Sequence, residues 1–338
     1  MTARRSVRPL VRLWVRRLAP WIVSIAVITG LLYQYPLERI IAELKHGNLA
    51  PLLPWALFVV ISTLLTIALW DRLLIRPTLG AVGYGALIRG KAASALLVAI
   101  HQGLGHGTYG VWLARVTGSG ARPAIGVIAY IAMSEVTALA LMASFVVHAF
   151  DADMPGNALE TLRIVAPLLA MALIAVALLG PRLFGRFVSD PRLLKPWSAI
   201  PLRAYAISLA GRTLNMGLFM TGTWAAMNAF GIDIPMVAVA TYLPVIILVA
   251  SLPINVAGFG AVQAAWLLFT PWAPGEQVLA FQFSWRLSIL AALILRSLPF
   301  LRRALREISS GAQPGDDGAD DPGAEPDGRA GRPAAERS

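Results

Sequence analysis

The chain has 338 residues, of which 57% are hydrophobic and 14% are charged, and its formal net charge is +11. This composition lies outside the range of soluble globular domains. Cysteine is absent, which excludes disulfides and thiolate metal sites. The basic residues flank apolar stretches instead of forming one soluble face, so no nucleic-acid partner is expected. The composition predicts an all-α integral membrane protein.

The chain opens with a basic arm, residues 1–17, which contains Arg4, Arg5, Arg8, Arg12, Arg16 and Arg17. Such an arm places the N-terminus in the cytoplasm. No small-residue cleavage site follows the first apolar stretch, which predicts a retained span. Abundant Ala and Gly, with only three Lys among 29 basic residues, are typical of a bacterial protein, and we expect the inner membrane.

Six apolar stretches approach the roughly 20 residues needed to cross about 30 Å of hydrocarbon. They are Leu18–Tyr35, Pro51–Trp70, Ala124–His148, Leu162–Gly180, Arg203–Phe230 and Gln277–Pro299. Basic clusters after the second span (Arg72, Arg76, Arg89, Lys91) and after the last (Arg302, Arg303, Arg306) are expected inside. Aromatic residues near span ends, among them Trp70 and Trp197, are expected to be interfacial anchors.

Two further apolar segments, Ala92–Arg115 and Pro235–Pro271, are interrupted by Gly-rich stretches with polar side chains. Within a bilayer, irregular backbone is tolerated only where it is buried in protein or lines a wet cavity. Charge places both ends of the first segment inside, with legs of about ten residues, so we expect a re-entrant hairpin entered from the cytoplasm. The second is expected to be a hairpin that begins and ends outside. Its longer legs leave open that it crosses, which would make eight spans.

Each half then reads span, span, hairpin, span, and the second half starts from the opposite side. This order predicts an inverted repeat, with repeat one at 18–150 and repeat two at 160–305 of a membrane domain 18–305. The acidic, Gly- and Pro-rich tail, 306–338, is expected to be disordered and cytoplasmic.

Three charged residues lie deep within predicted spans, away from the span ends: Glu135, Arg212 and Arg286. A charge at bilayer centre costs about 2.5–3.5 kcal/mol on insertion scales, so each is expected to face a partner in the protein interior. Either an arginine holds a lipid phosphate while Glu135 balances it or relays a proton, or the residues form a structural clamp between helices. The amides Asn215 and Asn228 are expected to make interhelical hydrogen bonds.

The polar residues of the two hairpins are the remaining candidates for substrate binding. They are His101 and His106 in the first, and Asn255, Gly258, Gly260 and Gln263 in the second. The histidines could bind a headgroup, or could satisfy backbone groups freed at the turn. A helix that starts at Phe259 could present backbone N–H groups to a phosphate, or the segment could be a Gly-packed turn with Asn255 as a cap. The spacing of the histidines does not favour a metal site, and no cofactor is expected.

The run LPINVAGFGAVQAAW (Leu252–Trp266) resembles the signature of the lysylphosphatidylglycerol synthase membrane-region family, which is flippase-like. Asn255 stands where that family has Ser, and Gln263 stands where it has Glu. AAMNAFGIDIP (Ala225–Pro235) and GLGHGTYGVWLARVTG (Gly103–Gly118) are similar to the linker and the first hairpin of the family. The resemblance implies lipid handling. It does not imply synthase activity, because the soluble transferase domain has no counterpart here.

We therefore predict a lipid translocator whose cargo is an anionic phospholipid, a polyprenyl-linked lipid or a hopanoid-type lipid. An enzyme is not expected, since no paired carboxylates or metal ligands are evident in the sequence. Two alternatives remain: an integral-membrane lipid-modifying enzyme, and a non-catalytic membrane partner of a lipid-biosynthesis complex.

Overall fold

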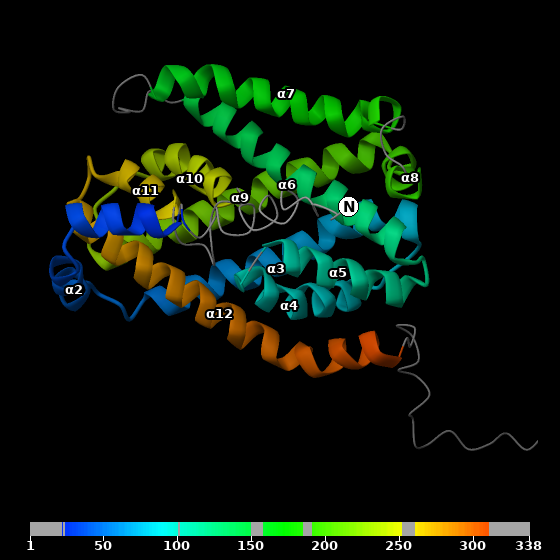
Figure 1. The fold of residues 1–338 in the computed structure, drawn as a ribbon, viewed down its shortest axis with the longest axis horizontal. Helices are drawn as coiled ribbons and strands as arrows, with labels where there is room; N and C mark the ends of the chain where they lie inside the picture. Colours follow the sequence, from blue (N-terminus) through cyan, green and yellow to red (C-terminus); the bar gives the residue numbers. More distant parts are fainter. Residues whose placement is uncertain are drawn as a thin grey trace, which may run out of the picture.

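The computed structural model describes residues 22, 24–100, 102–149, 158–184, 191–251 and 261–310, and within these ranges the chain forms helices and no strands (Figure 1). A short apolar helix, Ser24–Gln34, comes first. It is followed by α2 (Leu37–His46), α3 (Leu52–Leu79), α4 (Tyr84–Ile100), α5 (Gln102–Thr117), α6 (Ala121–Ala149), α7 (Ala158–Phe184), α8 (Pro191–Ala199), α9 (Leu202–Phe230), α10 (Met236–Ser251), α11 (Ala261–Trp266), the 3₁₀ turn η1 (Leu267–Phe269) and α12 (Gly275–Ser310).

Four of these helices are long and apolar enough to cross a membrane: α3, α6, the Glu160–Gly180 part of α7, and the Gly275–Ala304 part of α12. All four were expected from the sequence. Helix α9 has 29 residues but is more polar, because its sequence includes Arg212, Asn215 and Thr223. These three side chains are buried. The structure thus confirms an all-helical protein with four candidate membrane spans over the described residues. The number of six spans stays a prediction, since the first stretch, Leu18–Tyr35, lies partly outside these residues.

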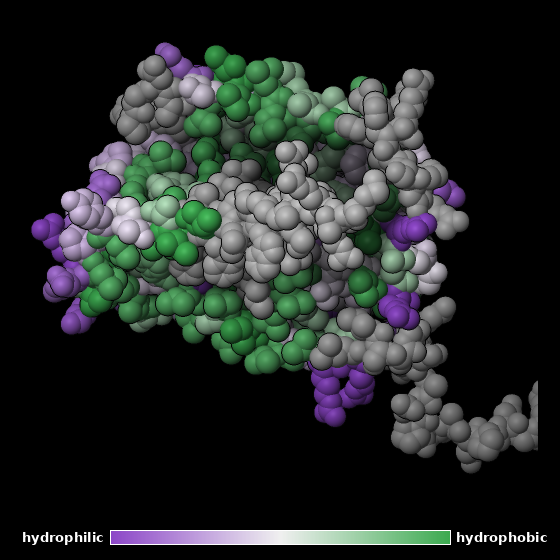
Figure 2. All heavy atoms as spheres, viewed as in Figure 1, coloured by the Kyte–Doolittle hydropathy of each residue, from purple (hydrophilic) through white to green (hydrophobic). Residues whose placement is uncertain are grey.

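The surface supports membrane embedding. In Figure 2 apolar residues cover much of the coloured surface, and hydrophilic residues lie mostly at its left and right ends and at its lower edge. On α7 the large side chains of Ile164, Leu168 and Met171 are more than half exposed. Apolar side chains exposed along a whole helix are unfavourable in water, whereas contact with lipid tails is favourable for them.

Helices α3 and α9 form the centre of the molecule and run antiparallel. A Cβ added at Gly222 would overlap Val59, and one added at Gly211 would overlap the Trp70 ring. Between these two close approaches, Thr66 Oγ1 donates a hydrogen bond of 2.7 Å to Asn215 Oδ1. The pairing falls near the middle of both helices, and it confirms the expected interhelical role of Asn215. Asn228 instead donates to the carbonyl of Trp224 within α9.

The remaining helices pack around this central pair in matching ways. Helix α4 packs against α12, and α10 packs against α6. Likewise α12 packs on α3 while α6 packs on α9, and the short helices α2 and α8 lie on α12 and α6 respectively. The buried apolar residues fall into two clusters, one around the start of α3 with α10 and α12, the other around the end of α3 with α4, α5 and α6.

The first hairpin differs from its prediction. Its legs, α4 and α5, have 17 and 16 residues instead of about ten, and the Gly-rich stretch Gly103–Gly110 is helical within α5. The junction between the legs lies at residue 101, outside the described residues. The close approach in this hairpin is made by another glycine: a Cβ added at Gly90 of α4 would overlap the Trp112 ring of α5, whereas Gly107 has open space around it. Because Gly103–Gly110 is helical, these glycines gave a misleading signal of broken backbone.

Two predicted boundaries were also wrong. Helix α3 continues to Leu79, so Asp71 lies inside the helix and Trp70 packs at Gly211 instead of at the interface. Helix α12 continues to Ser310, past the predicted start of the tail at 306, and Glu307 is buried. Charged residues led us to end both spans early, although the protein interior supplies partners for these charges.

Candidate functional site: a buried four-charge cluster

Two acidic and two basic side chains meet where α3, α4, α6 and α9 pack together. Asp71 lies on α3, Lys91 on α4, Glu135 on α6 and Arg212 on α9. We call these four residues the charged cluster. Glu135 is at the middle of the 29-residue α6, so the cluster lies deep within the helical bundle.

Arg212 is the hub of the charged cluster. Its Nη1 donates a 2.8 Å hydrogen bond to Glu135 Oε1, its Nη2 donates to Asp71 Oδ1, and its Nε donates to Ser208 Oγ at 3.3 Å. Each nitrogen of the guanidinium therefore has an acceptor. Arginine suits this position because its planar donors can engage two carboxylates at once.

Lys91 completes the charge balance. Its Nζ lies 2.5 Å from Asp71 Oδ2 and 3.8 Å from Glu135 Oε1. Asp71 is thus held by one cation at each oxygen, while Glu135 shares its Oε1 between both cations. With two carboxylates and two cations the cluster has no formal net charge, which permits its burial among apolar helices.

The four members differ in exposure. The side chains of Asp71 and Arg212 are 0% and 3% exposed, whereas those of Lys91 and Glu135 are 19% and 26% exposed. One side of the cluster is therefore sealed and the other side is partly open. A small ion or a polar group can reach Lys91 and Glu135 before it can reach Asp71.

Aromatic residues of the first hairpin extend the site toward the end of α12. Lys91 Nζ lies 5.3 Å from the ring centroid of Tyr109, and that ring stacks on Trp112. The Trp112 indole N–H donates a 2.8 Å hydrogen bond to Glu307 Oε2, and Glu307 Oε1 lies 3.0 Å from Arg89 Nη2. The Tyr109 hydroxyl is buried without a hydrogen-bond partner, which leaves a donor available close to the cluster.

Sequence reasoning found half of this site. Glu135 and Arg212 were predicted to be buried and paired, and they meet directly. Asp71 and Lys91 were missed: Lys91 was counted with the basic residues expected inside, and Asp71 lies just beyond the predicted end of the span at Trp70. The sequence did contain a signal that these two charges could be buried. Lys91 lies between the apolar stretches of α3 and α5, and Asp71 directly follows Trp70, the last aromatic residue of the predicted span.

The other predicted residues that the structure describes stand on α12, α11 and α5, which contribute none of the four charges of the cluster. Arg286 is partly buried on α12, and the same helix carries Arg296, whose Nη1 donates to the carbonyl of Val60 at 2.9 Å. Gln263 is buried on α11, and His106 is partly exposed on α5. His101, Asn255, Gly258 and Gly260 lie outside the described residues. Among the residues that the structure describes, no three His, Asp or Glu side chains gather as metal ligands would.

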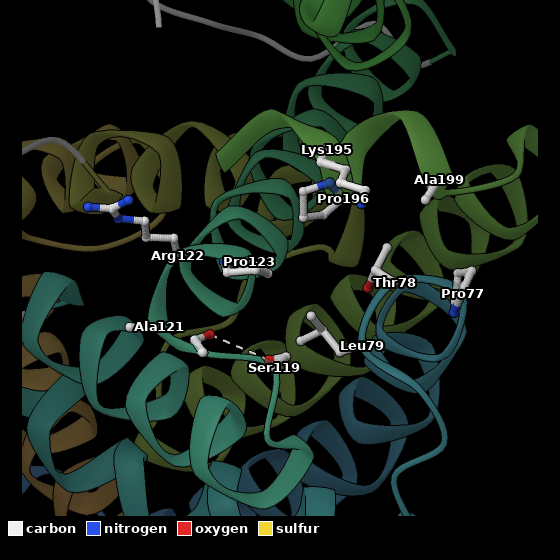
Figure 3. Close-up of a pocket in the computed structure, with 11 residues that line it drawn as sticks. Pro77, Thr78, Leu79, Ser119, Ala121, Arg122, Pro123, Lys195, Pro196 and Ala199 are labelled. Carbon is white, nitrogen blue, oxygen red and sulfur yellow. Dashed lines mark hydrogen bonds between the residues drawn. The ribbon is translucent and has the colours of Figure 1, made fainter. Parts of the chain in front are cut away.

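A pocket of about 740 Å³ opens where α3 ends, α6 begins and α8 packs on α6 (Figure 3). Lys195 and Pro196 of α8 lie across from Thr78 and Leu79 of α3, and the side chain of Arg122 extends away from them. Thr78 follows Asp71 by two helical turns on the same face of α3, a separation of about 10 Å. The pocket therefore lies on the same side of α3 as the charged cluster, and basic and apolar groups share its wall.

Comparison with known proteins found no matching family model, curated protein or solved structure. The resemblance to the lysylphosphatidylglycerol synthase membrane region therefore stays a prediction from Leu252–Trp266 and the hairpin stretches. What the structure defines directly is a helical membrane protein with a neutral cluster of four charges in its interior.

Proposed function

We propose that this protein is a lipid translocator that moves an anionic lipid, or a lipid-linked headgroup, between the leaflets of the bacterial inner membrane. The observation that carries the proposal is the charged cluster. Ionisable residues inside a membrane domain are costly, and they commonly mark substrate or ion pathways. Here two cations are held by carboxylates and lie beside a partly open side, so an anion can compete for them.

The contact pattern supports an inverted repeat. In this scheme α3 corresponds to α9, α4 to α10, α5 to α11 and α6 to α12. When two helices are in contact, their counterparts in the other repeat are in most cases also in contact. The short helices α2 and α8 exchange in the same way, since they pack on α12 and α6. Because α3 and α9 run antiparallel, this exchange reverses direction across the membrane, as the inverted repeats of many transporters do.

The arrangement of the two hairpins fits this scheme. The first hairpin is α4 with α5, and the described part of the second is α10 with α11. Each packs against the last long helix of the other repeat, α12 for α4 and α6 for α10. In this proposal the two repeats, packed around one central pair of helices, move against each other and open the site to one side of the membrane at a time.

The chemistry favours a phosphate as the bound group. Arg212 offers planar donors that match a phosphate or carboxylate, and Lys91 offers a point charge. The pocket at Lys195 provides a basic and apolar surface at the same end of α3, suited to a headgroup that approaches from the cytoplasmic leaflet. We infer this side from the arginines of the N-terminal arm and of α12. The same rule places both termini in the cytoplasm.

A leaflet-resolved assay in reconstituted vesicles tests the proposal. The full chain is inserted into vesicles with a fluorescent phosphatidylglycerol in one leaflet, and a membrane-impermeant quencher reports its movement. We expect the wild type to move intact lipid, and Lys91→Met to slow this movement at least tenfold. Arg39→Met at the exposed pair with Glu276, which lies 3.5 Å away, serves as control for loss of a cation.

The outcomes separate the candidate functions. Movement of intact lipid supports translocation. A changed lipid mass, detected by mass spectrometry of the extracted lipids, would identify a lipid-modifying enzyme instead. If lipid neither moves nor changes for any anionic cargo tested, the protein acts as a membrane partner of other proteins and the translocator proposal is wrong.

A further inference from the structure

The charge balance of the cluster restricts how an anion can bind there. Asp71 and Glu135 carry two negative charges, and Lys91 and Arg212 carry two positive charges. One phosphodiester anion bound at the cations would bring the site to a net charge of −1. An uncompensated charge is unfavourable in such surroundings, and protonation of one carboxylate would restore neutrality.

The geometry points to Glu135 as the group that takes this proton. Asp71 is fully buried and each of its oxygens faces a cation, so it stays ionised. The Glu135 side chain is 26% exposed, and both of its cation contacts are made through Oε1. If the phosphate takes Arg212 and Lys91 from Glu135, this carboxylate is left without cations and can accept a proton from water.

The groups that face Glu135 on neighbouring helices fit this assignment. They are Asp71 of α3, Lys91 of α4, Tyr109 of α5 and Arg212 of α9. Other helices packed on α6 carry ionisable groups that have contacts elsewhere. Arg163 of α7 donates to the carbonyl of Val147, Tyr205 of α9 packs on Tyr130, Tyr242 of α10 packs on Phe269, and Lys195 of α8 lies near the start of α6. Asp71 is the nearest other acid, and its cations hold it ionised.

We propose that each anionic headgroup binds together with one proton, carried by Glu135, so that lipid and proton cross the membrane as a neutral pair. This proposal rests on the proposed function, because it assumes that the charged cluster binds the headgroup. The chemistry is a proton transfer from water to a carboxylate oxygen, with no other bond made or broken. A proton gradient could then drive the lipid in one direction.

Calorimetry with the full chain in nonionic detergent tests the coupling. Dihexanoyl phosphatidylglycerol is titrated into the protein in two buffers that differ in ionisation enthalpy, which gives the protons taken up per lipid bound. We expect about one proton per lipid at pH 7–8. The affinity should rise by up to tenfold for each unit that the pH falls, as linkage requires for one proton.

Variants and probes identify the group and the ligand. Glu135→Gln should bind the lipid without proton uptake and with an affinity that is flat in pH. Glu276→Gln, at the exposed pair with Arg39, should behave as wild type. Dihexanoyl phosphatidylcholine has no net charge, so any binding of it should take up no proton. The deacylated headgroup, if it binds as tightly as the lipid, would show that a free phosphodiester is the ligand.

The possible failures are distinct. Wild-type binding of the anionic lipid without proton uptake overturns the coupling and leaves the translocator proposal standing. Proton uptake that persists in Glu135→Gln overturns the assignment to this residue. If Glu135→Gln does not fold, the proton count of the wild type still decides whether coupling exists. Absence of anionic lipid binding at every pH removes the proposed function and this inference together.

Discussion

A double-mutant cycle on Asp71 and Arg212 tests whether the cluster is held by mutual neutralisation. Replacing Arg212 with Met removes donors from three acceptors, Asp71, Glu135 and Ser208, and leaves the site with a net charge of −1. Breaking a buried ion pair in this way costs about 3–5 kcal/mol of unfolding free energy. Asp71→Asn should also destabilise the protein, because it leaves a net charge of +1.

The double variant should behave differently from the sum of the singles. In Asp71→Asn/Arg212→Met the remaining charges are Lys91 and Glu135, whose Nζ and Oε1 are 3.8 Å apart. Because the site is neutral again, we expect a coupling energy of about 2 kcal/mol or more. The unfolding free energies can be measured in mixed micelles of sodium dodecyl sulfate and a mild detergent, with tryptophan fluorescence as the signal.

The exposed pair Arg39 and Glu276 provides the control, with side chains that are 73% and 19% exposed. Its coupling should fall within about 0–1 kcal/mol, as for other surface pairs. If the Asp71 and Arg212 substitutions prove additive within about 0.5 kcal/mol, the two side chains do not depend on one another. Neutralisation would then not explain their burial.

Three further predictions test the packing and the topology. Gly90→Ala should lower the unfolding free energy by about 1–3 kcal/mol, because the new methyl would overlap Trp112. The matched control Gly107→Ala has open space around it and should be neutral or stabilising. Equal effects of the two substitutions would contradict the close approach of Gly90 to Trp112. Glu307→Gln should destabilise by about 1–3 kcal/mol, since Arg89 loses its carboxylate partner at 3.0 Å, whereas Glu160→Gln on α7 should have little effect in the same unfolding assay. Single cysteines at Lys45 of α2 and Ser198 of α8 should react with impermeant thiol reagents from opposite sides of the membrane, and labelling of both from one side would rule out the inverted repeat. Met171→Cys, exposed at the middle of the apolar helix α7, should stay unlabelled.

The long apolar helices could be predicted from the sequence because apolar length alone sets them. The stretches for α3, α6, α7 and α12 each exceed the thickness of the hydrocarbon layer, and no tertiary contact is needed to recognise them. The short helices α2 and α8 were missed. They lie in segments that read as charged loops, and their helical form depends on packing against α12 and α6.

The candidate site could be predicted only where a charge interrupts an apolar run. Glu135 and Arg212 are unmistakable for this reason. Asp71 stands at the polar end of an apolar run, where a charge is ordinary, and its burial depends on Arg212, 141 residues away in sequence. The Gly-rich stretch of α5 misled for another reason: glycine is compatible with both a turn and a helix, and Gly103–Gly110 is helical here.

The charged cluster draws its members unequally from the two halves of the chain. Asp71, Lys91 and Glu135 are synthesised first, and Arg212 arrives only after another 77 residues have left the ribosome. Until Arg212 is made, the cluster contains two carboxylates, Asp71 and Glu135, and one cation, Lys91. It therefore has a net charge of −1, and the first half must wait for the second half before it can assemble. Separately expressed halves should consequently be unstable alone and recover when produced together.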